Sequence, residues 1–182
     1  LEIVFGDDDG FLHAITLDGR ELEGFPVFAE SLIEASPAIA DLDGDGWLDI
    51  AAGSGDGRMY LWNHRGELLT GWPVRVGDQI ISSAALVDLD GDDRLDIVVG
   101  SKDNYLYGWT ATAEPLPGFP YDLGHHVLSS PWVGDLDSDG RADIVVGADN
   151  GIHLIRNVGP LGRAAWPMFH RDAANTGYTP SE

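Results

Sequence analysis

The 182-residue chain contains no cysteine, so disulfide bonds, zinc sites built from thiolates and cysteine-based catalysis are excluded. Positive charge is scarce: 10 Lys and Arg residues compare with 31 Asp and Glu residues, and the formal net charge is −21. Nucleic-acid phosphates and anionic membranes both attract basic surfaces, so neither partner is expected. No apolar run approaches the roughly 18 residues of a membrane span, and the first residues show no signal-peptide pattern.

The acidic residues are strongly biased toward the shorter side chain. Of the 31 acids, 23 are Asp and 8 are Glu. Short carboxylates suit tight loops and metal sites, so the bias indicates loops of that kind. Hydrophobic residues make up 43% of the chain, which is enough for a sizeable core.

A repeat with a period of 47 residues runs through the chain without insertion or deletion. An Asp-rich loop begins at Asp41 and recurs at Asp88 and Asp135. Two other features keep the same spacing, a glycine and an aromatic–proline pair: Gly6, Gly53, Gly100 and Gly147; Phe25-Pro26, Trp72-Pro73, Phe119-Pro120 and Trp166-Pro167. The period predicts a single domain of about four repeats, at approximately 1–34, 35–81, 82–128 and 129–182.

Each period reads as four short strands. In the third repeat these are Ser82–Val87, the β-branched run Asp96–Gly100, the aromatic run Tyr105–Trp109, and a strand starting near Gly118–Tyr121, whose proline requires an edge position. No stretch shows a sustained helical period. The sequence therefore predicts an all-β propeller of four-stranded antiparallel blades, about four blades in this chain. The recurring Trp62, Trp72, Trp109 and Trp166 are expected in the core between blades.

The two ends of the sequence lie on either side of one absent Asp-rich loop. The first blade should therefore lack its innermost strand, and the segment Thr176–Pro180 is in register to pair beside Ile3–Phe5. We favour a four-bladed ring closed by one chain. The alternative is half of a larger ring, completed by another copy or by further sequence.

The Asp-rich loops have the spacing of calcium ligands. Carboxylates at loop positions 1, 3, 5 and 9 can turn toward one centre, glycines permit the sharp turn, and the carbonyl at position 7 is a natural extra ligand. The predicted ligands of three Ca²⁺ ions are Asp41, Asp43, Asp45, Trp47 and Asp49; Asp88, Asp90, Asp92, Arg94 and Asp96; and Asp135, Asp137, Asp139, Arg141 and Asp143, with Trp47, Arg94 and Arg141 acting through backbone carbonyls. The alternative is an acidic surface turn that binds nothing.

The pattern Asp-x-Asp-x-Asp-Gly-x-x-Asp, followed by Asp-Ile-Val-Val-Gly, resembles the FG-GAP repeat of integrin α-chain-like propellers, also called VCBS-type. The resemblance covers essentially the whole chain. It implies that each loop joins the first two strands of a blade and holds one Ca²⁺. The first blade departs from the pattern because its loop is missing, so no fourth site is expected.

No nucleophile, metalloprotease or phosphate-loop motif is present. We therefore expect a non-catalytic, secreted or cell-surface module that binds a protein or glycan. The rivals are a polysaccharide lyase or glycosidase, or a purely structural repeat that assembles into a larger ring. The links between blades differ from repeat to repeat and lie at the end opposite the metal loops, which makes them the candidate ligand face unless they are merely unconstrained. Its residues would be Asp78, Gln79, Lys102, His125 and His126.

Overall fold

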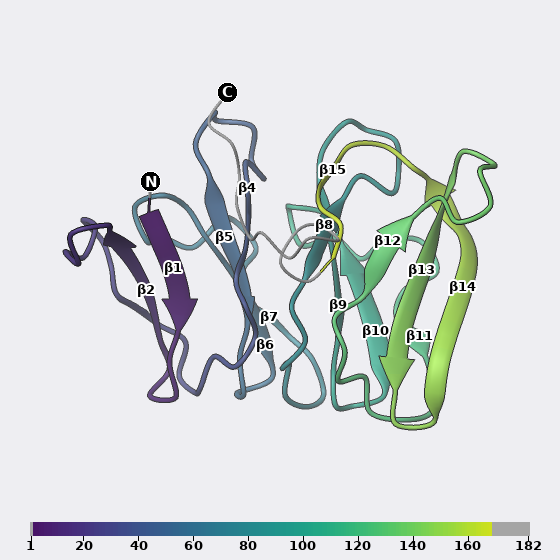
Figure 1. Cartoon of the computed structure of the whole chain (residues 1–182), viewed down its shortest axis with the longest axis horizontal. Coiled ribbons are helices and arrows are strands. Elements are labelled where there is room, and N and C mark those ends of the chain that lie inside the picture. The colour runs from purple at the N-terminus through teal and green to yellow at the C-terminus, as the bar shows by residue number, and fades with distance from the viewer. Residues whose placement is uncertain (1, 169–182) are drawn as a thin grey trace.

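The structure is a computed structural model that describes residues 2–168, and the regular secondary structure in that range is entirely β-strand (Figure 1). The strands form four antiparallel sheets, which we call blades I to IV. Blade I holds β1 (Glu2–Gly6), β2 (Phe11–Thr16) and β3 (Val27–Phe28), and blade II holds β4 (Ala38–Ala40), β5 (Asp49–Gly53), β6 (Arg58–Trp62) and β7 (Val74–Arg75). Blade III holds β8 (Ala85–Val87), β9 (Asp96–Gly100), β10 (Tyr105–Trp109), β11 (Tyr121–Asp122) and also β15 (Ala164–Trp166), and blade IV holds β12 (Trp132–Gly134), β13 (Arg141–Ala148) and β14 (Gly151–Pro160).

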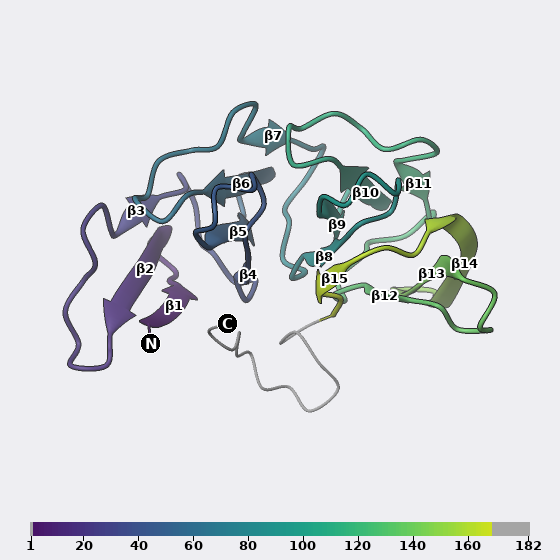
Figure 2. The same cartoon turned by 90° about the horizontal axis from the view of Figure 1, so that it is seen from above.

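The four blades stand side by side in an open arc (Figure 2). Among the described residues, an apolar core joins each pair of consecutive blades, but none joins blade I to blade IV. The ring of four blades that we favoured from the sequence is therefore not formed by residues 2–168. The segment Thr176–Pro180, predicted to close it, lies outside the described residues.

Three apolar cores fill the spaces between consecutive blades. The first joins blades I and II, the second joins blades II and III, and the third joins blades III and IV. The four recurring tryptophans are buried in them, as predicted: Trp62, Trp72, Trp109 and Trp166 are 3%, 6%, 4% and 3% exposed. The indole N–H of Trp72 donates to the Ala111 carbonyl at 2.7 Å, so the polar atom of that ring is satisfied.

The fourth repeat departs from the predicted blade. β15 does not join blade IV but pairs with β8, the innermost strand of blade III. After β14 the chain turns back along the second Asp-rich loop, where Gly162 N–H donates to the Asp88 carbonyl at 3.0 Å and Asp88 N–H donates to the Arg163 carbonyl at 2.8 Å. This path covers the open edge of β8 and buries the Trp166 indole in the core between blades II and III.

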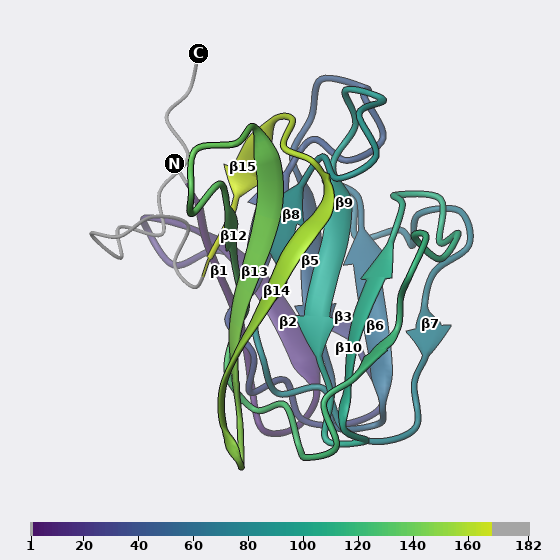
Figure 3. The same ribbon diagram turned by 90° about the vertical axis from the view of Figure 1, so that its right-hand side faces the viewer.

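The strand order places two kinds of connection at opposite ends of the array. The Asp-rich loops β4–β5, β8–β9 and β12–β13 lie at one end, which we call the metal-loop end. The hairpins β5–β6, β9–β10 and β13–β14 and the links between blades lie at the other, the linker end. Figure 3, a side view, shows β13 and β14 running the full height between the two ends.

Each hairpin at the linker end is tied to the link that precedes its blade. The N–H groups of Gly55, Lys102 and Asp149 donate to the carbonyls of Leu32, Gln79 and His126 at 2.9, 3.0 and 3.1 Å. Donors and acceptors are each spaced by 47 residues, so the repeat reproduces the same bond at three places.

Candidate metal centre

Each Asp-rich loop brings three carboxylates together. The ligand atoms of each trio lie within 4.8 Å of one another, and the trios are Asp41, Asp43 and Asp45; Asp88, Asp90 and Asp96; and Asp135, Asp137 and Asp143. Nine of the twelve predicted Asp ligands are thus brought into clusters. Like charges at this separation repel, so each cluster could hold a cation that compensates them.

The carboxylate at loop position 1 organises its loop through backbone N–H groups. Asp41 accepts from Gly44 and Gly46 at 2.8 and 3.1 Å. Asp88 accepts from Gly91 and Asp93 at 2.7 and 3.1 Å. Asp135 does the same in the third loop, and the N–H donor from Gly140 holds the pKa of Asp135 below its usual value. The loop is therefore wrapped around its first carboxylate.

The carboxylate at position 9 lies beneath each loop and is fully buried. Asp49, Asp96 and Asp143 are 0%, 1% and 2% exposed. One oxygen of each accepts the N–H of the residue after position 1, from Leu42 and Leu89 at 2.8 Å and from Leu136 at 3.2 Å. These bonds fix each buried carboxylate against the start of its loop.

The buried carboxylates are electrostatically unfavourable without a cation. Burial raises the pKa of Asp49 to about 6, and repulsion from Asp43 and Asp45 adds to it. Burial raises the pKa of Asp96 to about 7, with repulsion from its loop neighbours, Asp90 first, contributing further. The second oxygen of Asp49, Oδ1, is buried and has no hydrogen-bond partner. An unpaired buried carboxylate oxygen beneath an acidic loop fits a hard cation.

The remaining predicted ligands are placed less uniformly. Three predicted ligands lie outside the trios: Asp49 at position 9 of the first loop, and Asp92 and Asp139 at position 5 of the other two. Asp92 and Asp139 each accept the N–H of a position-7 residue, Arg94 or Arg141, at 2.8 Å. Asp45 accepts from Trp47 in the same way, also at 2.8 Å. The role of the position-7 carbonyls remains a prediction.

The third loop contacts a cationic side chain of β14 that the sequence analysis missed. The Arg156 guanidinium forms an ion pair with Asp137, one of the third trio. Residue 156 occupies the repeat position held by Ile15, Trp62 and Trp109. The sequence signal for this contact was a charged residue at a repeat position that is apolar in the other three repeats. The three acidic loops are therefore not electrostatically equivalent.

The residues predicted for the ligand face lie at the linker end, in two separate contacts. Lys102 Nζ donates to Gln79 Oε1 at 2.6 Å, and Asp78 beside it is exposed. His126 Nδ1 lies 3.5 Å from Asp149 Oδ2, and His125 is exposed.

The metal-loop end carries the exposed aromatic side chain of Trp47, a residue for which the sequence predicted a role of the backbone carbonyl only. The Trp47 ring is 61% exposed and stacks on His64, with ring centroids 4.9 Å apart. Trp47 stands where the other two loops have Arg94 and Arg141, so the blade II loop differs from them in chemistry.

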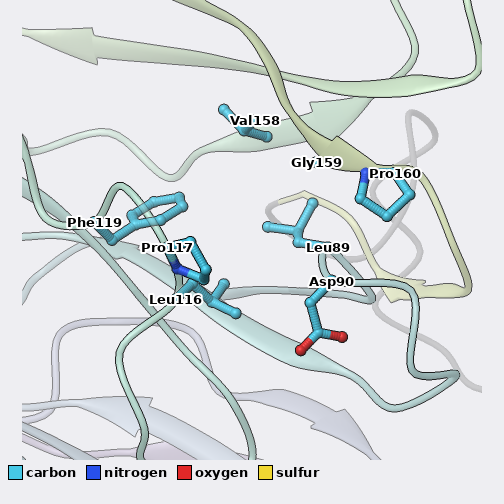
Figure 4. Close-up of a pocket in the computed structure, with 8 residues that line it drawn as sticks. All are labelled: Leu89, Asp90, Leu116, Pro117, Phe119, Val158, Gly159 and Pro160. Atoms are coloured by element: carbon cyan, nitrogen blue, oxygen red, sulfur yellow. The ribbon is translucent and has the colours of Figure 1, made fainter.

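A pocket of about 240 Å³ lies beside the second acidic loop, between blades III and IV (Figure 4). Its walls are mainly apolar and include Leu116, Phe119, Val158 and Pro160. Asp90 is the one charged side chain among the labelled lining residues. A single carboxylate on an apolar wall provides no pair of acid and base groups.

The sequence matches two family models. Residues 41–99 match the FG-GAP-like repeat, and residues 129–165 match the FG-GAP repeat. Together the two matches span just over half of the chain. The chain is therefore an FG-GAP-type repeat protein. Among curated proteins, no sequence matches the chain.

Solved structures show the same fold at low sequence identity. The V. cholerae biofilm matrix protein Bap1 is 22% identical with a TM-score of 0.61, over 82% of this chain and 26% of that one. BamB from Moraxella catarrhalis is 16% identical with a TM-score of 0.57, over 90% of this chain and 44% of that one. Sqt1 from Saccharomyces cerevisiae is 18% identical with a TM-score of 0.59, over 84% and 39%.

BamB and Sqt1 are β-propellers, so the fold of this chain is of the β-propeller type, as predicted. The chain spans between about a quarter and a half of the length of these three proteins. Within residues 2–168, no helix is long and apolar enough to span a membrane.

The buried carboxylates should destabilise the metal-free protein. We predict that Asp96→Asn raises the free energy of unfolding in EDTA at pH 7.5 by about 1 to 3 kcal/mol, because the amide keeps an acceptor for Leu89 and removes a buried like charge. Urea denaturation measures this. Asp93→Asn is the matched control: it lies on the same loop, is exposed and belongs to no trio, so it should change little. A clear loss of stability in Asp96→Asn would show that its charge is already compensated.

Proposed function

We propose that the chain is a Ca²⁺-stabilised, non-catalytic binding module that works outside the cell. The observation that carries the proposal is the buried, unpartnered Asp49 Oδ1 beneath an acidic loop whose spacing recurs twice more. FG-GAP repeat families are mostly non-catalytic structural or binding repeats, which supports the same reading.

The donor set favours Ca²⁺ over other cations. The available groups are all oxygens: carboxylates at positions 1, 3, 5 and 9, and a backbone carbonyl at position 7. Ca²⁺ takes six to eight oxygen ligands in flexible geometry, whereas Mg²⁺ requires a near-ideal octahedron and keeps its waters. With no cysteine in the chain, the softer metals that prefer thiolates are disfavoured.

The bound ion would act on stability. When bound, Ca²⁺ supplies compensating positive charge to the acidic loop. The chain's own residues then connect that loop to the blade, because a position-9 carboxylate in the first three residues of each second strand accepts a hydrogen bond from the start of the loop. These residues are Asp49, Asp96 and Asp143. Binding confined to the folded state adds directly to its stability.

The ligand of the module is proposed to be a protein or glycan that docks at the linker end. The links there differ between blades while the scaffold beneath them repeats, which is how recognition loops are presented on a rigid frame. A lyase or glycosidase would need a base, an acid and exposed aromatics on one face. The Lys102 ammonium is engaged with Gln79, which weighs against its use as a base.

An extracellular setting is supported by family and by one structural neighbour. FG-GAP repeats and the fold of Bap1, which is described as a biofilm matrix protein, are consistent with it. Ca²⁺ sites of low affinity are occupied only where the Ca²⁺ concentration is high, as it is outside cells.

We predict three bound Ca²⁺ ions per chain by isothermal titration calorimetry. Asp90→Ala should reduce the number to two, because repeats couple mainly to their neighbours. EDTA should lower the melting temperature of the wild-type protein and excess Ca²⁺ should restore it. Asp93→Ala, on the same loop but outside the trio, should still bind three ions. Identical melting curves in EDTA and in excess Ca²⁺ would contradict structural Ca²⁺ sites.

The third site should be the weakest. Arg156 already compensates Asp137, so an incoming cation gains less there than at the other loops. We predict that Arg156→Gln tightens one of the three Ca²⁺ affinities by about tenfold, or about 1.4 kcal/mol, and leaves the other two unchanged. Arg94→Gln, an exposed arginine on the second loop, is the control. Weaker binding in Arg156→Gln would mean that the guanidinium supports the site.

The location of the ligand face can be tested with a printed glycan array. On the glycan that binds most strongly, the double variant His125→Ala/His126→Ala should lose about tenfold in affinity, with its Ca²⁺-dependent melting temperature unchanged. Trp47→Ala tests the opposite end and should retain affinity. Loss of binding in Trp47→Ala, with the histidine variant unaffected, would place the site among the metal loops.

A further inference from the structure

Blade I has one face packed against blade II and one face open. Leu12 and Ala14 lie in the core shared with blade II. The residues of β2 that alternate with Leu12 and Ala14 point to the opposite face, together with their pairing partners on β1 and β3. On that face Ile3 pairs with Ile15, Phe5 with His13 and Phe11 with Phe28. On this open face Ile3, Phe5, Phe11 and Phe28 are 48%, 41%, 37% and 54% exposed.

The repeat shows what this open face corresponds to. The residues 47 positions after Ile3 and Phe5 are Ile50 and Ala52 of blade II, which are 5% and 2% exposed and lie in the core shared with blade I. Every later blade uses these positions to pack on the blade before it. The open face of blade I therefore corresponds to a face that is buried against the preceding blade in blades II to IV.

The polar groups on this face are already paired. His13 stacks on Phe5, with ring centroids 4.8 Å apart, and its two ring nitrogens lie 3.1 Å from Asp7 and 2.6 Å from Glu21. These two carboxylates raise the pKa of His13, Glu21 contributing most. Covering the face would therefore leave these three polar side chains hydrogen-bonded to one another.

Blade IV has an open face at the other end of the arc (Figure 2). In blades I to III the second strand and the third pair in one register, as in Gly6 with Leu12 and Gly100 with Leu106. In blade IV the corresponding Gly147 pairs with Ile152, one residue short, and β13 carries an irregularity between Ala142 and Ile144.

A slip of one residue moves every side chain of a strand to the opposite face. Ile155 consequently pairs with Ile144 and turns to the core shared with blade III, while Leu154 pairs with Val145 on the outer face. Ile152 and Leu154 are 83% and 43% exposed there. The slip thus replaces His153 and Ile155 on the outer face with Ile152 and Leu154, which exposes two aliphatic side chains there.

The two open faces are the two halves of one interface. The outer face of blade IV is the side on which blades I to III each receive the next blade, and the open face of blade I is the side with which blades II to IV each contact the previous one. We propose that a second copy of this chain docks its blade IV on the open face of blade I, and that the same contact made in return closes a ring of two chains.

Two copies satisfy both faces at once. A head-to-tail contact either closes into a ring or continues as a filament, and propeller rings commonly close at four to eight blades. Four sheets from each of two copies give eight. Each junction between chains then brings together the same two kinds of face that meet between consecutive blades within the chain.

The test is the mass in solution, measured by sedimentation equilibrium with Ca²⁺ and 150 mM salt present. The proposal expects twice the 19.6 kDa of one chain. Phe5→Asp and Leu154→Asp should each give single chains, with circular dichroism and Ca²⁺-dependent melting unchanged. Leu68→Asp is the control: it is 47% exposed but lies in the β6–β7 connection, outside both faces, so it should remain a dimer.

Mixing the two variants tests the head-to-tail geometry. Phe5→Asp retains an intact blade IV and Leu154→Asp an intact blade I, so the mixture should associate at one junction although neither variant does alone. A wild-type protein that is a single chain at 50 µM, or that forms assemblies larger than two, would overturn the proposal. Dissociation by Phe5→Asp with none by Leu154→Asp would also overturn it, because that result indicates a contact between two copies of blade I.

Discussion

Every sheet in this protein is apolar on both faces, and burying both faces is the constraint from which the rest of the architecture follows. A strand pairs within its own sheet, but the sheet has no stability until another covers it. The 47-residue repeat meets this requirement by making each blade the cover of the next. Small residues permit the close approach: a Cβ on Gly100 would lie 2.4 Å from Val127, and one on Gly53 would lie 2.1 Å from Ile80. Three interfaces are satisfied in this way, and the two faces at the ends of the arc are not.

The acidic loops exploit the order that packing creates. Because the blades repeat, the loops gather at one end, and the apolar interior holds the position-9 carboxylates where water does not reach them. The same burial that makes Asp49 and Asp96 costly as anions also prepares them for a cation. The repeat also leaves room for individual differences. Arg156 compensates the third loop and Trp47 gives the first an exposed ring, so loops of one spacing differ in charge and surface.

Much of this could be predicted from the sequence because the repeat is a strong local signal. The bounds expected for β9 and β10 are those observed, and the Asp spacing indicated the carboxylate clusters. The path of β15, the slip in β14 and the open arc could not be predicted in this way. The location of Trp166 and the register of β14 are choices between partners of similar chemistry: all three cores are apolar, and either register puts an aliphatic side chain on each face of β14. Period alone does not decide such choices, since it describes the average blade and these features belong to single blades.

The central claim is that each Asp-rich loop is built around one Ca²⁺ ion. An anomalous difference map from crystals grown with Ca²⁺ tests it most directly. The account predicts three peaks per chain, each about 2.4 Å from carboxylate oxygens at loop positions 1 and 3, with the first peak close enough to engage Asp49 Oδ1 directly or through one water. Loops without a peak, with Asp49 Oδ1 bonded instead to a protein donor, would contradict it.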